Sequence, residues 1–326
     1  KASCRVSRKH SCASDQLAAF HSRPAWLGRG VNRRKGALMS NKVVLMGVKG
    51  GPAIRHNGPM PTSSLIEIAG RTCVVDCGLG VSKGLVQTGL SLKSLDLIFI
   101  THLHSDHILE LGGLIHTAWT SGLATPVHVY GPKGIGAVWE GFLSSLAFDI
   151  DLRIDDEGRP DLRGLVTITE YDEGIVANLP NGPVVRALRV DHPPILDCFA
   201  LRFDSPDWSV CFSADTAYFP PLADFARGCD LLIHEAMLEA GVDRLVARTT
   251  GDGAKLKAHI VRAHTEARDA AKIAQTAGVP RLALHHLVPA DDPEITADHW
   301  RAACAAAFSG EIIIGYDGCV IKGPNS

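Results

Sequence analysis

Residues 101–107 read Thr-His-Leu-His-Ser-Asp-His and place three imidazoles and one carboxylate close together in the chain. Imidazole nitrogens and carboxylate oxygens are the usual ligands of zinc and similar cations, and catalytic sites combine them while leaving a position for water. A purely structural role is a poor explanation, because four polar groups after a buried strand are costly when they lack partners. The segment therefore predicts a metal site.

The apolar run at 95–100 predicts the buried strand that positions this segment. Side chains alternate along an extended chain, so His102 and His104 can point to the same side. The chain then turns into a predicted helix at Asp106 and His107, which places a second pair of donors beside the first. The spacing predicts two adjacent metal sites built on one strand-to-helix turn.

Strand-like runs outnumber helical patterns in the rest of the chain, which favours two sheets packed face to face with helices outside, an α+β architecture. The predicted strands are 42–48, 65–68, 72–76, 95–100, 127–130, 165–170, 184–190, 199–203, 209–212, 231–234, 281–285, 311–315 and 319–322. The predicted helices are 107–121, 134–146, 220–227, 266–277 and 293–308. Segments 149–160 and 241–258 read as loops, and the second is a candidate cover for a site.

Charge is distributed unevenly between the first 38 residues and the remainder. Residues 1–38 carry nine Lys/Arg and one acidic residue, which leaves a formal charge of −10 for residues 39–326 out of the total of −2. Residues 1–38 lack the apolar core of a secretory signal. We interpret them as a basic, disordered leader, with a targeting segment as the alternative. An acidic body argues against nucleic acid as the main partner.

The chain has nine cysteines without a CxxC pair, most of them in strand-like runs. Buried, reduced thiols are typical of a cytosolic protein, so we expect a cytoplasmic location. No run of about 18 apolar residues appears in the sequence, so we do not expect a membrane span.

Further donor residues stand at the ends of later predicted strands or just before a helix. They are His192, Asp215, His234, Glu235, His264, His285 and His286. His192 also reads as an exposed turn residue before two prolines, and Asp215 as a turn-initiating aspartate. His285 and His286 point to opposite faces of a strand, so at most one of them is a ligand, and the pattern favours His286.

These elements resemble the metallo-β-lactamase-fold hydrolases, and within them the ribonuclease Z-like branch. The matching positions are His102, His104, Asp106 and His107, Asp215 of "FSADT", His234 and Glu235 of "HEA", His264 of "AHT", His286 of "LALHH" and Asp76 of "VVDCG". The resemblance implies a four-layer αββα sandwich of two mixed sheets over residues 39–326. It also implies that His102, His104 and His192 hold one cation, that Asp106, His107 and His286 hold a second, and that Asp215 bridges both.

The resemblance further implies a hydrolase that attacks its substrate with hydroxide generated from metal-bound water. The predicted cofactor is one or two Zn2+ per chain, with Mn2+ and Fe2+ as alternatives. The predicted catalytic residues are Asp106, His264 as proton donor, and Glu235 as its support. A role for His264 and Glu235 in hydrogen bonding to the ligands alone is an equal alternative.

The sequence leaves the substrate open, and we expect a small organic molecule such as an ester, lactone, sulfate or aryl halide. Ribonuclease Z enzymes usually carry a long basic arm between the strand-end histidine and the bridging aspartate, whereas only 22 residues separate His192 from Asp215 here. We therefore do not expect nucleic acid or a membrane as a partner. The alternatives are a hydrolytic dehalogenase of the chlorothalonil type, a ribonuclease Z-like phosphodiesterase acting on transfer-RNA 3′ ends, and a non-catalytic metal-binding protein. A homodimer is left open.

Overall fold

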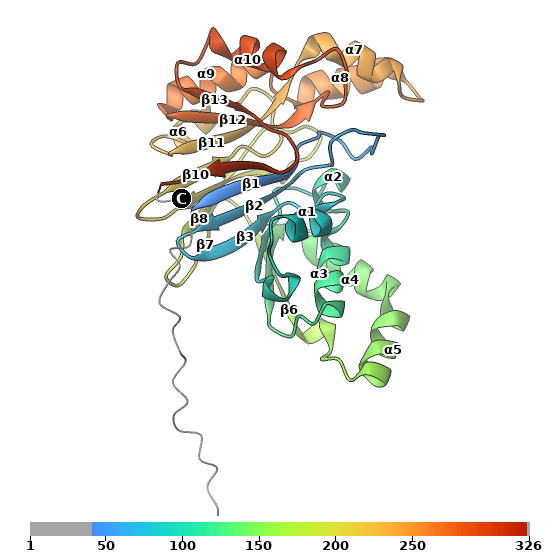
Figure 1. Cartoon of the computed structure of the whole chain (residues 1–326). Coiled ribbons are helices and arrows are strands. Elements are labelled where there is room, and N and C mark those ends of the chain that lie inside the picture. The colour runs from blue at the N-terminus through green and yellow to red at the C-terminus, as the bar shows by residue number, and fades with distance from the viewer. Residues whose placement is uncertain (1–40, 325–326) are drawn as a thin grey trace, which may run out of the picture. The chain divides into compact units, whose positions relative to one another are not determined.

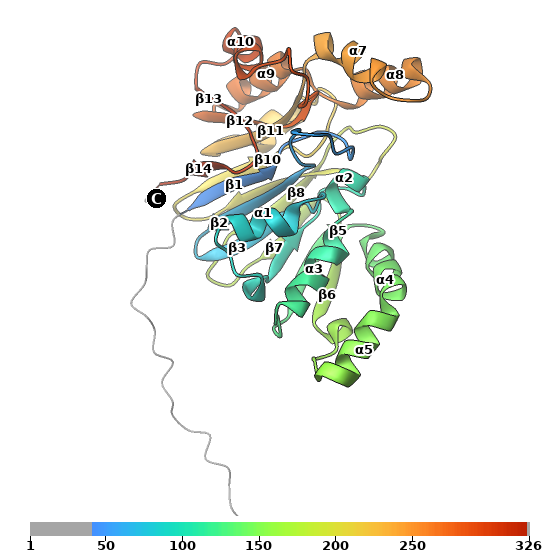
Figure 2. The same ribbon diagram turned by 45° about the vertical axis from the view of Figure 1, so that its right-hand side comes forward.

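Two seven-stranded sheets pack face to face in the computed structural model, which describes residues 41–324 of the chain. Helices cover the outer face of each sheet, as Figures 1 and 2 show. The predicted αββα sandwich of two mixed sheets is therefore confirmed. The predicted leader at 1–38 lies outside the described residues, and the division at residue 38/39 stays a prediction.

The first sheet is antiparallel along one half and parallel along the other. In spatial order its strands are β14 (Cys319–Lys322), β1 (Lys42–Gly47), β2 (Ser63–Ile68), β3 (Arg71–Val75), β4 (Leu97–Phe99), β5 (Val127–Pro132) and β6 (Val166–Tyr171). The parallel half begins at β3, so the carboxyl ends of β3 and β4 meet at the same edge of the sheet.

The second sheet is parallel from its first strand to β10 and antiparallel from there on. In spatial order its strands are β13 (Glu311–Ile314), β12 (Arg281–Val288), β11 (Leu231–Met237), β10 (Ser209–Phe212), β9 (Phe199–Asp204), β8 (Val184–Arg189) and β7 (Gly174–Asn178). Because β9 runs opposite to both neighbours, β8 runs in the direction of β10. The carboxyl ends of β8, β10, β11 and β12 therefore lie at one edge.

The inner faces of both sheets supply a shared aromatic and aliphatic core. Phe99 of β4 stacks on Tyr130 of β5, with ring centroids 4.8 Å apart, and meets the edge of Phe203 from the second sheet at 5.3 Å. Burying a side chain of this size contributes about 1.5–3 kcal/mol to stability, so these contacts hold the two sheets against each other. The sheets thus form a rigid support for the residues at their common edge.

Helices of the outer layers bury their apolar faces in two further cores. On the first sheet these are α1 (Val81–Gln87), α3 (Leu111–Thr120), α4 (Ile135–Ser145) and α5 (Ala147–Glu157); on the second they are α6 (Pro221–Phe225), α9 (Ala267–Ala277) and α10 (Ala297–Ala305). Two short 3-10 helices, η1 (Leu92–Ser94) and η2 (Leu162–Gly164), precede β4 and β6. Helix α2 (Ser105–Ile108) follows β4 directly.

The helix predicted over 107–121 is interrupted between α2 and α3. Glu110 occupies the break, where its backbone N–H donates to the carbonyl of Cys77 and its carboxylate accepts from the backbone N–H groups of Gly80 and Ser82. A continuous helix could not place this carboxylate over the start of α1. The break therefore ties α2 to the segment that follows β3.

Both predicted loops are wrong, because each contains helices. Segment 149–160 lies largely in α5, where Asp149, Arg153 and Glu157 form ion pairs one helical turn apart and Ile150 is buried. Segment 241–258 belongs to α7 (Glu239–Ala247) and α8 (Gly253–Ala263), with the Gly-rich residues in the connection between them. Strand β7 was not predicted, since most of its residues are exposed and lack an apolar alternation.

The seven cysteines within the described residues are all buried and free, which agrees with reduced thiols. No helix within residues 41–324 combines the length and the apolar character needed to cross a membrane.

Candidate metal centre

The donor residues gather where the strands of both sheets end. His102 and His104 follow β4, and His104 is the N-cap residue of α2 in extended backbone. Asp106 and His107 lie in α2. His192, Asp215 and His286 come from the second sheet: the first two follow β8 and β10, and His286 lies within β12 with a positive φ of 43°. That left-handed turn breaks the regular pairing of β12 with β11 and aims His286 at the edge.

The structure brings all seven predicted metal ligands together as two groups that share one carboxylate. Ligand atoms of His102, His104, His192 and Asp215 lie within 4.8 Å of one another, and those of Asp106, His107, Asp215 and His286 do the same. All of these residues are buried except His104, which is half-buried. Two groups that meet at Asp215 match the geometry expected of a two-cation site.

The ring nitrogens converge in a way that suits a cation better than hydrogen bonding among the rings. Nδ1 of His104 lies 3.1 Å from Nε2 of His102 and 3.0 Å from Nε2 of His192. Within the described residues, the buried atoms Nε2 of His107 and Oδ1 of Asp215 have no hydrogen-bond partner. Since buried polar atoms are normally paired, these converging and unpaired donors fit divalent cations.

Burial and nearby charges shift the pKa values of His102, His104 and Asp215 toward the forms that bind metals. Burial lowers the pKa of His102 well below its ordinary value and lowers that of His104 to about 4, so both imidazoles are neutral. For Asp215, burial favours the neutral acid, but His286 and His107 hold its pKa well below the usual range. Neutral imidazole and ionised carboxylate are the forms that bind metals.

The pKa values of His286 and His107 are shifted upward, opposite to those of His102 and His104. Burial disfavours the charged form of both rings, yet Asp215 raises the pKa of His286 to about 10 and that of His107 well above its ordinary value. Asp106 adds to the effect through its hydrogen bond with His286. The buried acidic groups therefore favour positive charge at this position.

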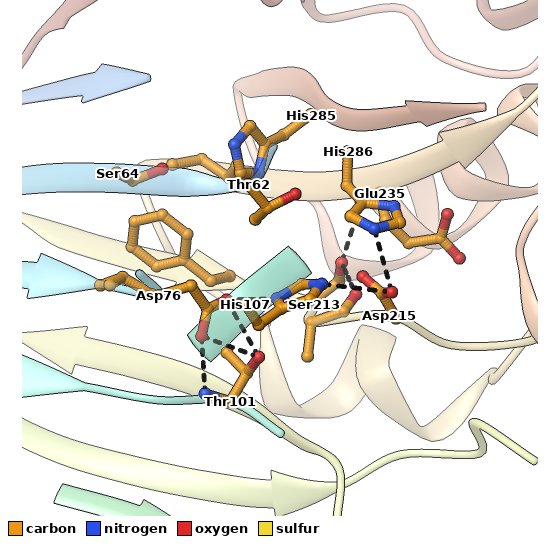
Figure 3. Close-up of a pocket in the computed structure, with 14 residues that line it drawn as sticks. Thr62, Ser64, Asp76, Thr101, His107, Ser213, Asp215, Glu235, His285 and His286 are labelled. Carbon is orange, nitrogen blue, oxygen red and sulfur yellow. Dashed lines mark hydrogen bonds and ion pairs between the residues drawn. The ribbon is translucent and has the colours of Figure 1, made fainter. Parts of the chain in front are cut away.

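Hydrogen bonds behind the ligands fix which ring nitrogen faces the site. Asp76 accepts from the backbone N–H and hydroxyl of Thr101 and from Nδ1 of His107 at 2.8 Å, as Figure 3 shows. Nδ1 of His192 donates to the carbonyl of Ala263 at 2.9 Å. Each contact leaves Nε2 free to face the donor group, the usual arrangement for a metal-binding histidine.

Glu235 and His264 lie beside the shared carboxylate. Oε2 of Glu235 is 3.4 Å from Nδ1 of His264, while Oε1 accepts from the backbone N–H of Thr265 at 2.8 Å and of Thr216 at 3.3 Å. The ring of His264 stacks on that of His286 at 5.3 Å between centroids. A carboxylate held in this way can orient the imidazole, and the catalytic role of the pair stays a prediction.

The other two candidate histidines are placed outside the donor groups. His234 is buried, and its Nδ1 donates to the carbonyl of Glu235 at 2.6 Å. His285 is also buried, and its Nε2 donates to the carbonyl of Gly47 at 2.9 Å. The His285 ring links β12 to the end of β1, whereas the His234 ring bonds within its own strand.

The sequence reasoning missed the contribution of the segment after β1. Lys49 is buried, and burial lowers its pKa against the opposing charges of Asp291 and Asp106. The backbone N–H of Gly51 donates to Oδ2 of Asp106 at 2.7 Å. Gly50 lies so close to His286 that a Cβ there would stand 2.8 Å from its ring. Gly50 and Gly51 are adjacent in the sequence, but no motif marks them as part of a metal site.

The chain is similar to known proteins over most of its length. A family model described as "Anti-Pycsar protein Apyc1" matches residues 42–267. Ribonuclease Z of Mycobacterium bovis (strain BCG / Pasteur 1173P2) is 32% identical over 258 residues, which cover 78% of this chain and 89% of that protein. Ribonuclease Z of Mycobacterium sp. (strain KMS) is 32% identical over 270 residues, which cover 82% and 90%.

Two solved structures share the fold over most of the chain. The metallo-β-lactamase fold protein YhfI of Bacillus subtilis has a TM-score of 0.63 at 23% identity and covers 87% of this chain and 100% of its own. Human tRNase Z, short form, has a TM-score of 0.61 at 20% identity and covers 87% and 99%.

These relatives correct the predicted substrate and partner. The expectations of a small organic substrate and of no nucleic-acid partner are wrong, because the similar proteins are named as ribonucleases. The dehalogenase alternative finds no support among them. The error came from using the charge of the whole body, an average that says little about the field at one site. Lys49, Arg55 and Arg248 lie near one another beside the donor groups, together with Asp291 and Asp106, despite that negative total.

Proposed function

This chain belongs to the family described as Anti-Pycsar protein Apyc1 and to the ribonuclease Z-like branch of the metallo-β-lactamase-fold hydrolases, and we propose that it cleaves phosphodiester bonds of RNA. It is a metal-dependent hydrolase. The proposed substrate is precursor transfer RNA, cut at its 3′ end. The sharing of Asp215 between two donor groups is the observation that carries the proposal, because two clustered cations suit phosphodiester cleavage.

We assign the two donor groups to two divalent cations, with Zn2+ as the proposed ion and Mn2+ or Fe2+ as alternatives. His102, His104 and His192 would hold one ion, Asp106, His107 and His286 the other, and Asp215 both. When bound, such a pair acidifies a water molecule and offsets the charge of a phosphodiester. Asp106 has a second task, since its bond from Gly51 holds the segment after β1 against the site.

The proposed proton donor to the leaving ribose oxygen is His264. Its Nδ1 faces Oε2 of Glu235, so Nε2 is the atom that would carry the transferred proton. Glu235 is itself anchored by the backbone N–H groups of Thr216 and Thr265, which keeps its carboxylate beside the ring. Glu235 is therefore proposed as a positioning residue for His264.

The proposal is tested with a 3′-extended precursor transfer RNA labelled at its 5′ end. Metal-loaded wild type should cut the RNA near the start of the extension, and His104→Ala should lower the rate about a hundredfold or more, since it removes a ligand at the centre of one donor group. His116→Gln is the matched control, because His116 pairs with Asp149 on the outer layer, away from the centre. Uncut RNA with wild type, or cleavage by His104→Ala at the wild-type rate, would contradict the proposal.

A further inference from the structure

A cavity of about 280 Å³ opens beside the donor groups, and His104, Asp106, Asp215 and His286 line part of it. Helices α7 and α8 form one wall with the apolar side chains of Leu245, Leu256 and Ile260, and the segment after β1 forms the opposite wall. Figures 1 and 2 both show α7 and α8 side by side at the end of the sandwich where α2 lies. We call this space the α7–α8 chamber.

A buried lysine gives the chamber a positive end. Lys49 is only 4% exposed, and its Nζ donates to the backbone carbonyls of Gly50 at 2.9 Å and Gly51 at 3.1 Å. Within the described residues no carboxylate lies within ion-pair distance of this ammonium group. Because a buried charge is costly when only neutral groups contact it, Lys49 is suited to meet an anion that enters the chamber.

The charges around Lys49 strengthen this end of the chamber. Asp291 is already paired with two arginines, since it lies 2.7 Å from Nε of Arg55 and 3.0 Å from Nη2 of Arg248. Lys49 and Arg55 both line the chamber, together with the carboxylates of Asp106 and Asp215. The ammonium group of Lys49 and the guanidinium group of Arg55 are suited to contact a phosphate.

A histidine on α8 supplies a polar group next to the apolar wall. His259 lines the chamber, and its ring centroid lies 6.4 Å from that of His104. No hydrogen bond of the His259 ring nitrogens occurs within residues 41–324. An imidazole in this state can both stack on a flat ring and bond to its edge.

We propose that the α7–α8 chamber binds one unpaired nucleotide of the substrate, the one adjoining the phosphodiester that is cut; this rests on the proposed function. Its base packs against the apolar wall with His259 at the edge, and the phosphate on its far side contacts Lys49. A paired nucleotide has its base covered by stacking, so only a single-stranded segment can enter. Strands β9 and β10 occupy the 22 residues between His192 and Asp215, so the grip on RNA must come from elsewhere.

The test measures binding of two nucleotides to the metal-loaded protein by calorimetry. Adenosine 3′,5′-bisphosphate carries both phosphates of such a nucleotide, and adenosine 5′-monophosphate carries one. Wild type should bind the bisphosphate about tenfold more tightly, and Lys49→Met should lose this preference while Lys49→Arg restores it. Lys255→Met is the control, since Lys255 lies on α8 with a side chain 86% exposed to solvent, and it should keep the preference.

Leu256→Trp tests the chamber from its other wall, independently of the segment after β1. The larger ring should fill the space and weaken binding of both nucleotides about tenfold. A wild-type preference retained in Lys49→Met, or unchanged affinities in Leu256→Trp, would overturn the proposal. If the protein cleaves RNA but does not prefer the bisphosphate, nucleotide binding in the α7–α8 chamber is refuted and the proposed function stands. If it prefers the bisphosphate but does not cleave RNA, binding in the chamber is supported and the proposed function is refuted.

Discussion

Replacing Gly50 with alanine should weaken the second donor group without removing any ligand. A Cβ at this position would lie 2.5 Å from Cγ2 of Val288, 2.8 Å from Cε1 of His286 and 2.9 Å from its Nδ1. Favourable carbon contacts begin at about 3.5 Å, so the new methyl group overlaps the ring by roughly 0.6 Å or more. Either the ring or the segment after β1 must move.

The ring of His286 has little room to move, because it is held between two other rings. His107 lies on one side at 5.2 Å between centroids and His264 on the other at 5.3 Å. Its Nε2 also lies 3.0 Å from Asp215 and 3.2 Å from Asp106. Overpacking of this kind costs about 1–3 kcal/mol. If most of that cost is expressed at the ligand, affinity for the second cation falls about 10- to 100-fold.

The assay is a competition for metal between the protein and a chromophoric chelator. The metal that remains bound per chain is measured as the first and then the second cation is released. Gly50→Ala should release one cation per chain at lower chelator concentration than wild type, and the cation held by the group around His104 should be less affected. Gly141→Ala is the matched control, since no atom lies within 4 Å of its added Cβ. Identical release curves for wild type and Gly50→Ala would refute the reasoning.

Three further predictions concern residues that support the site or the fold. Asp76→Asn removes the carboxylate that accepts a hydrogen bond from His107. In the same competition assay it should lower the affinity for the second cation about 10- to 100-fold, and unchanged affinity would contradict this role. Burial lowers the pKa of His285 to about 3, so the folded state takes up fewer protons than the unfolded state below pH 6.5 and loses stability as the pH falls, by roughly 2 kcal/mol between pH 6.5 and 5. His285→Gln, which can still donate to the Gly47 carbonyl, should lose that part of the slope in urea unfolding, and a wild-type slope would argue against it. Phe203→Ala should reduce the free energy of unfolding by about 3–5 kcal/mol, and a loss below about 1 kcal/mol would contradict its place in the inner core.

Much of the fold was predictable because the buried strands carry continuous apolar runs. Segments such as 42–48 and 281–285 appear in the structure as β1 and β12 with small shifts at their ends. The edge strand β7 was missed, since its residues are largely exposed and do not alternate. The prediction of a loop in place of α5 is wrong, because the many acidic residues of this segment suggest a loop while ion pairs one helical turn apart stabilise the helix.

The metal-ligand residues were predictable for a different reason. Histidines and aspartates follow directly after predicted strands, where the ends of neighbouring strands meet. His192 and Asp215 each had a plausible role in a turn, and only their convergence in space at the edge of the second sheet distinguishes the two roles. Lys49 and His259 could not be assigned in this way. Their relevance depends on how α7, α8 and the segment after β1 surround the chamber, and no short motif encodes that arrangement.

The substrate was the least predictable property. A formal charge summed over residues 39–326 does not describe the field beside Lys49, where Arg55 and Arg248 both pair with Asp291. The short connection between His192 and Asp215 shows only that β9 and β10 fill it. Neither observation decides between RNA and a small molecule as substrate, and the similarity to proteins named as ribonucleases outweighs both.

The central claim is that two cations share Asp215. Anomalous diffraction from crystals grown with Zn2+ tests it directly, because the signal locates each ion. The account predicts two peaks about 3.5–4 Å apart, one beside His102, His104 and His192 and the other beside His107 and His286, with the Asp215 carboxylate between them. A single peak, or two peaks that do not both contact Asp215, would contradict it.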